Sequence, residues 1–300
     1  MKAIFHNIIG IIIIVLLSIN TIIMAIPVIL CALLKLLPVY RWQEWMSKVL
    51  VVLASFWMSI NNKVSLALLP TQYKVHFSEQ LDAKRSYLIL CNHQSWLDIV
   101  VLQQIFLNKI PFCKFFMKQE LIYVPIIGLA CWALDFPLMK RYSKSYLAKH
   151  PEKKGQDLIQ TKLACQKFKT RNISVVNFVE GTRFRYEKHQ RCDGQYNHLL
   201  KPRAGGVAMV LNVLEDTLDG VLDVTISYPD KKNSNFWGFL SGRVKEIDVH
   251  IKKIPLSEIP YQNYYDSEEG KAVFQKWLNA LWSEKDRLLQ NLEAKKKGED

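Results

Sequence analysis

The sequence predicts an α/β fold, in which a mostly parallel or mixed sheet is flanked by helices and preceded by a membrane-embedded pair of helices. No Asp, Glu, Lys or Arg occurs between Phe5 and Leu34, which is typical of a membrane segment. Beyond about residue 70, short apolar runs rich in β-formers alternate with longer mixed segments of helical length. This alternation predicts one α/β domain around a mostly parallel sheet.

Four apolar runs of the second part have the length and composition of strands. They are SYLILCN (86–92), NISVVNFV (172–179), LDVTISY (222–228) and VKEIDVHI (244–251). The segments Ser143–Arg171 and Ala204–Asp216 have helical length, and residues 264–300 are expected to form a charged C-terminal helix with a solvated tail. We therefore divide the chain into a membrane anchor, residues 1–69, and a globular domain, residues 70–300.

The composition indicates a folded, basic protein with reduced thiols. Half of the 300 residues are hydrophobic and 22% are charged, which excludes a disordered chain. Lys and Arg number 40 against 27 Asp and Glu, so the net charge is +13. This charge favours anionic partners, namely lipid headgroups, phosphorylated substrates or nucleic acid. The six cysteines form no CxxC pair and the seven histidines are dispersed, so we expect neither disulfides nor a metal site.

The first apolar segment, residues 8–34, is expected to be a membrane anchor. Its 27 residues would form a helix about 40 Å long, which is enough to cross a bilayer with tilt, and Pro27 should kink it. A secretory signal peptide is the alternative. The run is too long for one, and Ile23 stands where a cleavage site ending at Ala25 needs a small residue. We therefore expect a retained anchor.

A second apolar segment covers residues 49–62. Fourteen uncharged residues are few for a span, so we expect residues 1–69 to form either a membrane-embedded hairpin or a span followed by an interfacial helix. An ordinary buried core helix is the alternative for the second segment. Tryptophans suited to a membrane interface lie nearby: Trp42, Trp45 and Trp57. If the first helix spans, the basic residues after it place the globular part in the cytosol: Lys35, Arg41, Lys48 and Lys63.

The motif NHQSWLD, residues 92–98, follows the first expected strand. On a continuous helix His93 and Asp98 would point about 140° apart, but in a turn between a strand and a helix they can touch. Ligand sites of open α/β sheets form at the carboxyl ends of strands. A histidine oriented by a carboxylate is the arrangement of a general base. The alternatives are a strand-end histidine with an unrelated helix-capping Asp98, or a Cys–His pair with Cys91.

The motif FVEGTRF, residues 178–184, also follows an expected strand and belongs at the same edge of the sheet. Gly181 permits a tight turn. Arg183 offers a planar fork that matches phosphate oxygens, and Glu180 is placed to position Arg183 or a substrate hydroxyl. Taken alone, the stretch is explained better by an ordinary turn with a surface ion pair.

Three further segments carry basic residues beside turns: KQELIYVPIIG (118–128), LDFPLMKR (134–141) and LLKPRAGG (199–206). We single out Lys118, Arg141 and Arg203 in them as anion-binding candidates. Arg203 stands just before a helical segment, and a helix N-terminus with basic side chains is a natural seat for phosphate. Surface charge beside a turn is the alternative for each of the three.

Taken in order, these segments resemble the glycerolipid acyltransferase family, specifically the 1-acylglycerol-3-phosphate acyltransferases. The NHxxxxD block is matched in full by residues 92–98, and the FPEGTR block is matched with Val179 in place of proline. The block KxELxxxPxxG is matched by Lys118, Glu120, Leu121, Pro125 and Gly128. EGTRF followed by Lys188, His189 and LLKPRAGG is similar to the long-chain and lysocardiolipin-type subgroup. The resemblance covers about residues 85–230 and the N-terminal hairpin.

The resemblance implies a reaction and its substrates. His93 would deprotonate the free hydroxyl of a lysophospholipid, whose oxygen attacks the thioester of a fatty acyl-CoA, and Asp98 would orient His93. The residues expected to bind substrate are Glu180, Gly181, Thr182, Arg183, Lys118, Arg141 and Arg203. No cofactor is implied, because acyl-CoA or acyl carrier protein is itself the donor substrate. The expected partners are the lysophospholipid, the acyl donor and the bilayer.

Other functions also fit the sequence. In one alternative the same acyl transfer uses a different acceptor, namely lysophosphatidylglycerol, lysocardiolipin or glycerol-3-phosphate. A non-catalytic lipid-binding protein is the alternative from another class, and the intact His93, Asp98, Glu180 and Arg183 count against it. Nucleic-acid binding would suit the charge, but no recognition motif is present. The compact anchor indicates a bacterial inner membrane, with the globular domain facing the cytosol.

Overall fold

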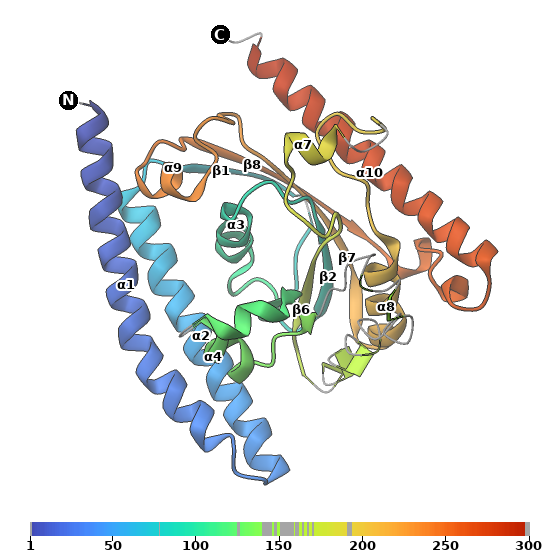
Figure 1. The fold of residues 1–300 in the computed structure, drawn as a ribbon, viewed down its shortest axis with the longest axis horizontal. Helices are drawn as coiled ribbons and strands as arrows, with labels where there is room; N and C mark the ends of the chain where they lie inside the picture. The colour runs from blue at the N-terminus through green and yellow to red at the C-terminus, as the bar shows by residue number, and fades with distance from the viewer. Residues whose placement is uncertain are drawn as a thin grey trace.

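The computed structural model combines an N-terminal helical hairpin with a mixed α/β domain (Figure 1). It describes residues 2–77, 79–124, 127–139, 171–190 and 194–297. Between 139 and 171 it describes in addition residues 146, 149–150, 159, 162–163, 165–166 and 168–169. The helix expected over Ser143–Arg171 therefore lies largely outside the described residues.

A six-stranded mixed sheet forms the centre of the domain, in the order β1-β8-β7-β2-β6-β3. Its strands are β1 Gln72–His76, β2 Ser86–Cys91, β3 Cys113–Phe115, β6 Ser174–Phe178, β7 Leu218–Ser227 and β8 Glu246–Ile254. Every pairing is parallel except that of β7 with β8. The mixed sheet is thus confirmed, and the four expected strands correspond to β2, β6, β7 and β8. A second, two-stranded sheet pairs β4 Met117–Lys118 with β5 Leu138–Met139.

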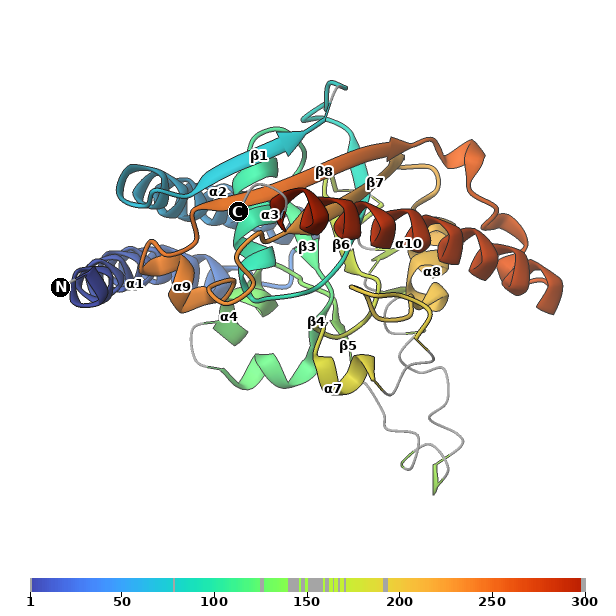
Figure 2. The ribbon, with the colours of Figure 1, turned by 90° about the horizontal axis from the view of Figure 1, so that it is seen from above.

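The described part of the domain also contains helices, of which α3, α8 and α10 cover the sheet and the others are short. The helices are α3 Leu97–Phe106, α4 Ile127–Ala133, α7 Tyr186–His189, α8 Ala204–Leu214, α9 Phe236–Leu240 and α10 Glu268–Lys297, with 3₁₀ turns at Gln119–Tyr123, Leu256–Glu258 and Gln262–Tyr264. Helices α8 and α10 pack on one face of the sheet and α3 on the other (Figures 1 and 2). Strand β2 is buried throughout, as a strand covered on both faces must be.

The register of β2 places its end beside the end of β6 and beside the later part of β7. Cys91, the last residue of β2, is level with Phe178 of β6 on one side and Val224 of β7 on the other. Because the three strands run parallel, the segments that follow β2 and β6 leave the sheet at the same edge. The two motifs singled out in the sequence follow those strands, and therefore meet there.

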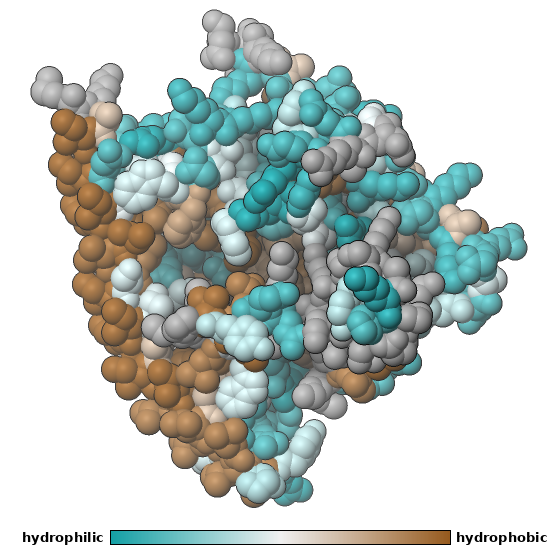
Figure 3. All heavy atoms as spheres, viewed as in Figure 1, coloured by the Kyte–Doolittle hydropathy of each residue, from teal (hydrophilic) through white to brown (hydrophobic). Residues whose placement is uncertain are grey.

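The N-terminal helices α1 Lys2–Leu34 and α2 Tyr40–Leu68 form an antiparallel hairpin (Figure 1). Both are long and apolar enough to cross a membrane. Helix α2 extends beyond the apolar segment 49–62 at both ends. Before that segment Glu44 pairs with Arg171 at 2.6 Å, and within it Asn61 accepts a hydrogen bond of 2.7 Å from Asn20 of α1. Figure 3 shows an almost unbroken band of hydrophobic side chains along the hairpin.

The globular domain holds α1 near its N-terminal end through close packing and polar bonds. His6 pairs with the Ser241 carbonyl at 2.8 Å, and Arg243 donates to Asn7 at 2.6 Å. Gly10 allows α9 to come close, since a Cβ atom there would lie only 3.0 Å from the Trp237 ring. These contacts join the first turns of the chain to the loop that precedes β8.

The domain also holds the other end of the hairpin, through an ion-pair network. Lys35 pairs with Asp135 at 2.6 Å. Arg171 bridges the same Asp135 to Glu44 of α2, at 2.6 Å to each carboxylate. The side chains of this network are between 12% and 24% exposed, so water screens their charges only partly. The domain therefore lies along the full length of the hairpin.

Replacement of Arg171 by Met should destabilise the fold by about 3 kcal/mol, because it leaves two partly buried carboxylates without a shared cation. Thermal unfolding in detergent, followed by circular dichroism, measures the loss. The matched control is Lys169→Met, whose exposed ion pair with Asp216 spans 3.4 Å and should contribute less than about 1 kcal/mol. Equal melting temperatures for the two variants would contradict a structural role for the network.

Candidate active site

His93 and Asp98 form a hydrogen-bonded pair at the carboxyl end of β2. The His93 Nδ1 and Asp98 Oδ2 atoms are 2.7 Å apart. The chain turns sharply after Cys91 because the Asn92 side chain takes over the pairing with β7, exchanging two bonds of 2.9 Å with the backbone of Ile226. Helix α3 then begins at Leu97, which brings Asp98 back to the histidine.

Asp98 is fully buried and both of its carboxylate oxygens are hydrogen-bonded. The Oδ2 atom also accepts bonds from the backbone amides of Gln94 and Ser95, at 2.7 and 2.9 Å. The Oδ1 atom accepts a bond of 2.6 Å from the hydroxyl of Tyr228, which follows β7. An ionised carboxylate only accepts hydrogen bonds, so the donors on both of its oxygens fix its orientation. Asp98 in turn holds the Nδ1 side of His93 and leaves Nε2 for a substrate.

The His93 ring is also held by an aromatic neighbour. The ring of Phe178, at the end of β6, stacks on it with centroids 4.0 Å apart and planes inclined by 15°. Phe115 of β3 lies behind Phe178, with a centroid distance of 6.1 Å. Sequence reasoning missed both rings, because only the pairing of β6 with β2 and β3 brings them to the histidine.

The Cys–His alternative is not supported by the geometry. Cys91 is fully buried, does not line the cavity at His93, and its Sγ atom lies 3.8 Å from Asn92 Oδ1. Burial raises the pKa of the Cys91 thiol well above its ordinary value, so it stays protonated and poorly nucleophilic.

The EGTR turn, residues 180–183, follows β6 and packs against the His93 turn. The amide of Phe184 donates a bond of 2.7 Å to the carbonyl of His93. Gly181 has φ +69°, a left-handed conformation that glycine adopts without strain, and a Cβ atom there would lie 3.3 Å from the Arg203 side chain. Val179, which replaces the expected proline, is buried and donates its amide to the Cys91 carbonyl at 3.4 Å, a bond that proline cannot make.

Glu180 lies behind the site and not on its wall. It is only 2% exposed, and it accepts bonds of 3.4 and 3.3 Å from the backbone amides of His93 and Leu200. Burial raises the pKa of Glu180 to about 8, although the two amides act in the opposite direction. Glu180 therefore links the His93 turn to the segment before α8, and we call this link the brace. The sequence instead predicts that Glu180 binds substrate.

Among the described residues, four cationic side chains line the cavity beside His93: Arg183, Arg185, Lys188 and Arg203. Arg183 lies over the ring of Trp96, 4.8 Å from its centroid, in a cation–π contact. Thr182 lines the same wall and accepts a bond of 2.6 Å from Lys188. From the sequence, Lys188 enters only as part of the family pattern and Arg185 is not named, because charged residues in short surface loops are common and carry no specific signal for binding.

Two of the expected substrate-binding residues cannot be placed at the site. Lys118 ends the short strand β4, but its side chain lies outside the described part of the chain. Arg141 lies wholly outside the described residues. Their roles stay predictions.

The cavity at His93 has a volume of about 1070 Å³ and extends to the N-terminal hairpin. Its apolar part is lined by residues of α1, α2 and the segment 99–136, among them Met24, Val28, Ala54, Met58, Phe112, Leu129 and Leu134. Its basic part is formed by the four cations named above. The two parts share His93 and Phe178 in one lining, so the cavity offers a long apolar chain and an anionic group access to the same histidine.

Residues 72–229 match the acyltransferase family, and residues 238–299 match the acyltransferase C-terminus family. The chain belongs to the acyltransferase family. The sequence of this acyltransferase is 28% identical over 214 residues to human 1-acyl-sn-glycerol-3-phosphate acyltransferase delta, covering 68% of the chain and 52% of the human protein. It is 30% identical over 185 residues to the human gamma enzyme, covering 58% and 44%. The acyltransferase thus spans about half the length of the curated relatives that it matches.

A solved structure has the same fold along the whole chain. The crystal structure of the 1-acyl-sn-glycerophosphate acyltransferase PlsC from Thermotoga maritima covers 98% of both chains with a TM-score of 0.56, at 15% sequence identity. The likeness includes the two N-terminal helices as well as the α/β domain, which confirms the expected fold class.

The raised pKa of Glu180 predicts that the acyltransferase loses stability as the pH rises from about 4.5 to about 8. Between these values the folded protein binds more protons than the unfolded chain, so deprotonation favours unfolding. Glu180→Gln should flatten this part of the curve of melting temperature against pH, although the variant loses one good acceptor.

The exposed Glu187→Gln serves as the control and should leave the shape of the curve unchanged. If wild type and Glu180→Gln had parallel curves over this range, a neutral Glu180 at the brace would be ruled out.

Proposed function

We propose that this acyltransferase moves a fatty acyl group from acyl-CoA to the free sn-2 hydroxyl of 1-acylglycerol-3-phosphate, giving phosphatidic acid. The observation that carries the proposal is the place of the His93–Asp98 pair, in one cavity with both an apolar part and a cationic part. An acyl chain and a phosphate are the two features that both substrates combine. The relatives, both 1-acyl-sn-glycerol-3-phosphate acyltransferases, are named for the same acceptor.

In the proposed mechanism, Nε2 of His93 accepts the proton of the acceptor hydroxyl. The oxygen attacks the thioester carbonyl and forms a tetrahedral intermediate, which collapses with loss of the CoA thiolate. The imidazolium returns its proton to that thiolate, so the histidine is regenerated and no acyl-enzyme forms. Asp98 stabilises the transient imidazolium through the bond at Nδ1, which also fixes the ring tautomer.

The acceptor phosphate is proposed to bind in the basic part of the cavity. Arg183 presents a planar fork whose position is fixed by stacking on Trp96, and Arg203 stands beside Gly181 just before α8. Glycine at position 181 lets Arg203 pack closely, since a Cβ atom there would lie only 3.3 Å from the Arg203 side chain. Arg185 and Lys188 add positive charge at the same wall.

The apolar part of the cavity is proposed to hold a fatty acyl chain. Helices α1 and α2 supply part of its wall through Met24, Ala54 and Met58. A binding cavity walled by the hairpin gives a lipid a route from the hydrocarbon layer to His93 without crossing water. The hairpin is then part of the substrate-binding machinery as well as an anchor.

We propose that the hairpin lies in one leaflet of the membrane and does not cross it. The domain holds α1 at Asn7 and again at Lys35, and a helix of α1's length spans about 50 Å. A crossing helix would draw the polar groups of the domain into the hydrocarbon, which is costly. The outward face of the hairpin remains apolar, and the charge of +13 favours an anionic leaflet. The cytosolic face of a bacterial inner membrane fits this arrangement.

His93→Ala should abolish acyl transfer, with a loss of at least about 10³-fold in kcat, because general-base catalysis and the attack it enables depend on this ring. Purified protein in detergent receives labelled oleoyl-CoA and lysophosphatidate, and phosphatidate is quantified. His198→Ala, at a histidine that does not line the cavity, is the control and should remain active.

The same assay decides between acceptors. Lysophosphatidylglycerol, lysocardiolipin and glycerol-3-phosphate replace lysophosphatidate in parallel reactions, and acyl carrier protein replaces CoA. Preferential transfer to lysocardiolipin or lysophosphatidylglycerol would move the protein to phospholipid remodelling, as the EGTRF and Lys188-His189 pattern allows. Folded protein that transfers to none of them with either donor would favour a non-catalytic lipid-binding role.

Arg183→Gln should raise the KM for lysophosphatidate, lowering kcat/KM by about 10–100-fold, because a charge-assisted bond contributes about 1.5–3 kcal/mol. The loss should be much smaller with monoacylglycerol, which lacks the phosphate. Arg243→Gln, which removes an arginine bonded to Asn7 away from the cavity, provides the comparison. A similar loss with both acceptors would show that Arg183 does not bind the phosphate.

A further inference from the structure

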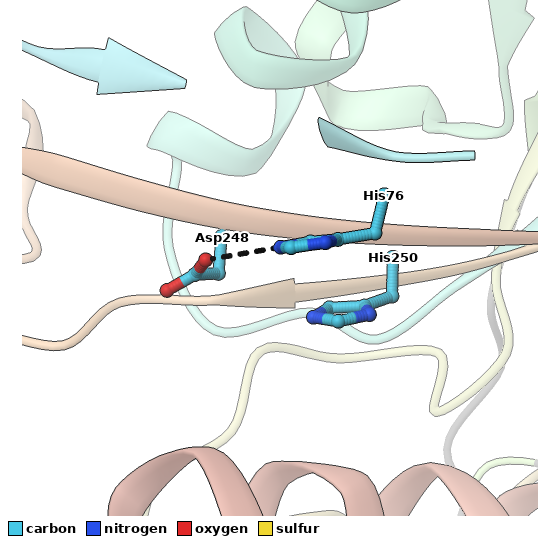
Figure 4. Close-up of side chains that lie close together, drawn as sticks. All are labelled: His76, Asp248 and His250. Carbon is cyan, nitrogen blue, oxygen red and sulfur yellow. Dashed lines mark ion pairs between the residues drawn. The ribbon is translucent and has the colours of Figure 1, made fainter. Parts of the chain in front are cut away.

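Three metal-ligating side chains meet on the edge of the sheet, away from the proposed active site. They are His76 on β1, and Asp248 and His250 on β8 (Figure 4). Strands β1 and β8 pair in parallel, and the register sets His76 directly beside His250. Asp248 stands two residues before His250, so both point to the same face of the strand.

The ligand atoms of the cluster already lie close together. One donor atom from each residue lies within 4.8 Å of the others. The two imidazole rings are stacked, with centroids 4.1 Å apart and planes inclined by 12°. The Nε2 atom of His76 lies 3.5 Å from an Asp248 oxygen, and both rings turn a nitrogen toward the side on which that carboxylate lies (Figure 4). Tetrahedral zinc needs ligand atoms about 3.4 Å apart, given bonds of about 2.0–2.1 Å. The donor atoms of the cluster, which lie within 4.8 Å of one another, must therefore come slightly closer. A change in the side-chain torsion angles of the half-exposed His76 can shorten these distances.

One nitrogen of the cluster is without a hydrogen-bond partner. The Nε2 atom of His250 is buried and bonds to no described group, a state that costs about 1–3 kcal/mol in an ordinary protein. Such groups are rare in native proteins, and a bound ion is one of the partners that would satisfy this nitrogen.

The surrounding charges balance, so they do not exclude a cation. Glu246 and Asp248 supply negative charge from β8, and Lys74 of β1 pairs with Glu246 at 2.6 Å. Lys295, near the end of α10, is the positive group that faces His250. With the Asp248 carboxylate as its one anionic ligand, a dication would leave the three-residue cluster with a net charge of +1.

We propose that His76, Asp248 and His250 bind a divalent transition-metal ion, with zinc as the best fit. Two imidazole nitrogens and one carboxylate oxygen are a typical zinc donor set, and water would fill the fourth position. The ligand side chains point to the face covered by α10, whereas Cys91 and His93 follow the opposite face of β2 toward α3. The metal therefore takes no part in acyl transfer. It would fasten β1, and with it the end of α2, to β8.

The test uses the full chain in detergent, with any affinity tag removed. Isothermal titration with Zn²⁺ should give one site per chain, and bound Co²⁺ should show the intense visible bands of a tetrahedral nitrogen and oxygen site. His76→Ala and Asp248→Asn should each weaken zinc binding at least about tenfold, since even outer-sphere partners of metals contribute about 10–100-fold. Zinc should also raise the melting temperature of wild type but not of these variants.

His198→Ala is the matched control, because His198 also lies 3.5 Å from a carboxylate, that of Glu293, but belongs to no group of three metal-ligating side chains among the described residues. It should bind zinc as wild type does. His76 is half exposed, so its variant should fold, and circular dichroism verifies this. Three results would each overturn the proposal. In the first, wild type binds no zinc, and in the second, both ligand variants bind it with unchanged affinity. The third result is a sulfur-to-cobalt charge-transfer band, which would assign the metal to cysteines.

Discussion

The buried carboxylate of Asp98 is the constraint on which the site depends. A carboxylate removed from water must find donors, and here they come from the His93 ring, the amides of Gln94 and Ser95, and the Tyr228 hydroxyl. These groups belong to the turn after β2 and to the end of β7. The turn, the start of α3 and the end of β7 therefore have one arrangement in which the charge is satisfied, and that arrangement aims His93 into the cavity.

Glu180 ties the second motif to the first in a different way. Its carboxyl group is buried and binds backbone amides on two segments, the His93 turn and the stretch before α8. The same stretch carries Arg203 to the wall of the cavity. A glutamate in this position serves geometry, because it sets the distance between the proposed base and the proposed phosphate-binding residues.

In the proposed function, the hairpin links membrane attachment to substrate binding. Its outer side is apolar, its inner side walls the cavity, and its two ends are tied to the domain by polar bonds at Asn7 and Lys35. The strand that follows it, β1, continues the attachment by pairing with β8. The hairpin is thus held at each end and along its length, and these contacts fix the position of the apolar cavity wall relative to His93.

The sequence by itself determined the α/β class, four of the strands, the two apolar N-terminal segments and the ordered motifs around His93 and Arg183. These are local properties: hydrophobic period, strand-forming runs, and turn residues that stand directly after a strand. Parallel pairing then brings the two motifs to one edge without further information.

Only the tertiary structure decided which groups surround those motifs. The stacking of Phe178 on His93, the bond from Tyr228 to Asp98 and the buried position of Glu180 depend on strand order and register. The part of α2 before its apolar segment carries Glu44, whose partner Arg171 lies far away in the sequence. His76 and His250 are unrelated in sequence and become neighbours solely because β1 pairs with β8. Contacts between distant segments come from packing and pairing, and no local pattern of residues encodes them.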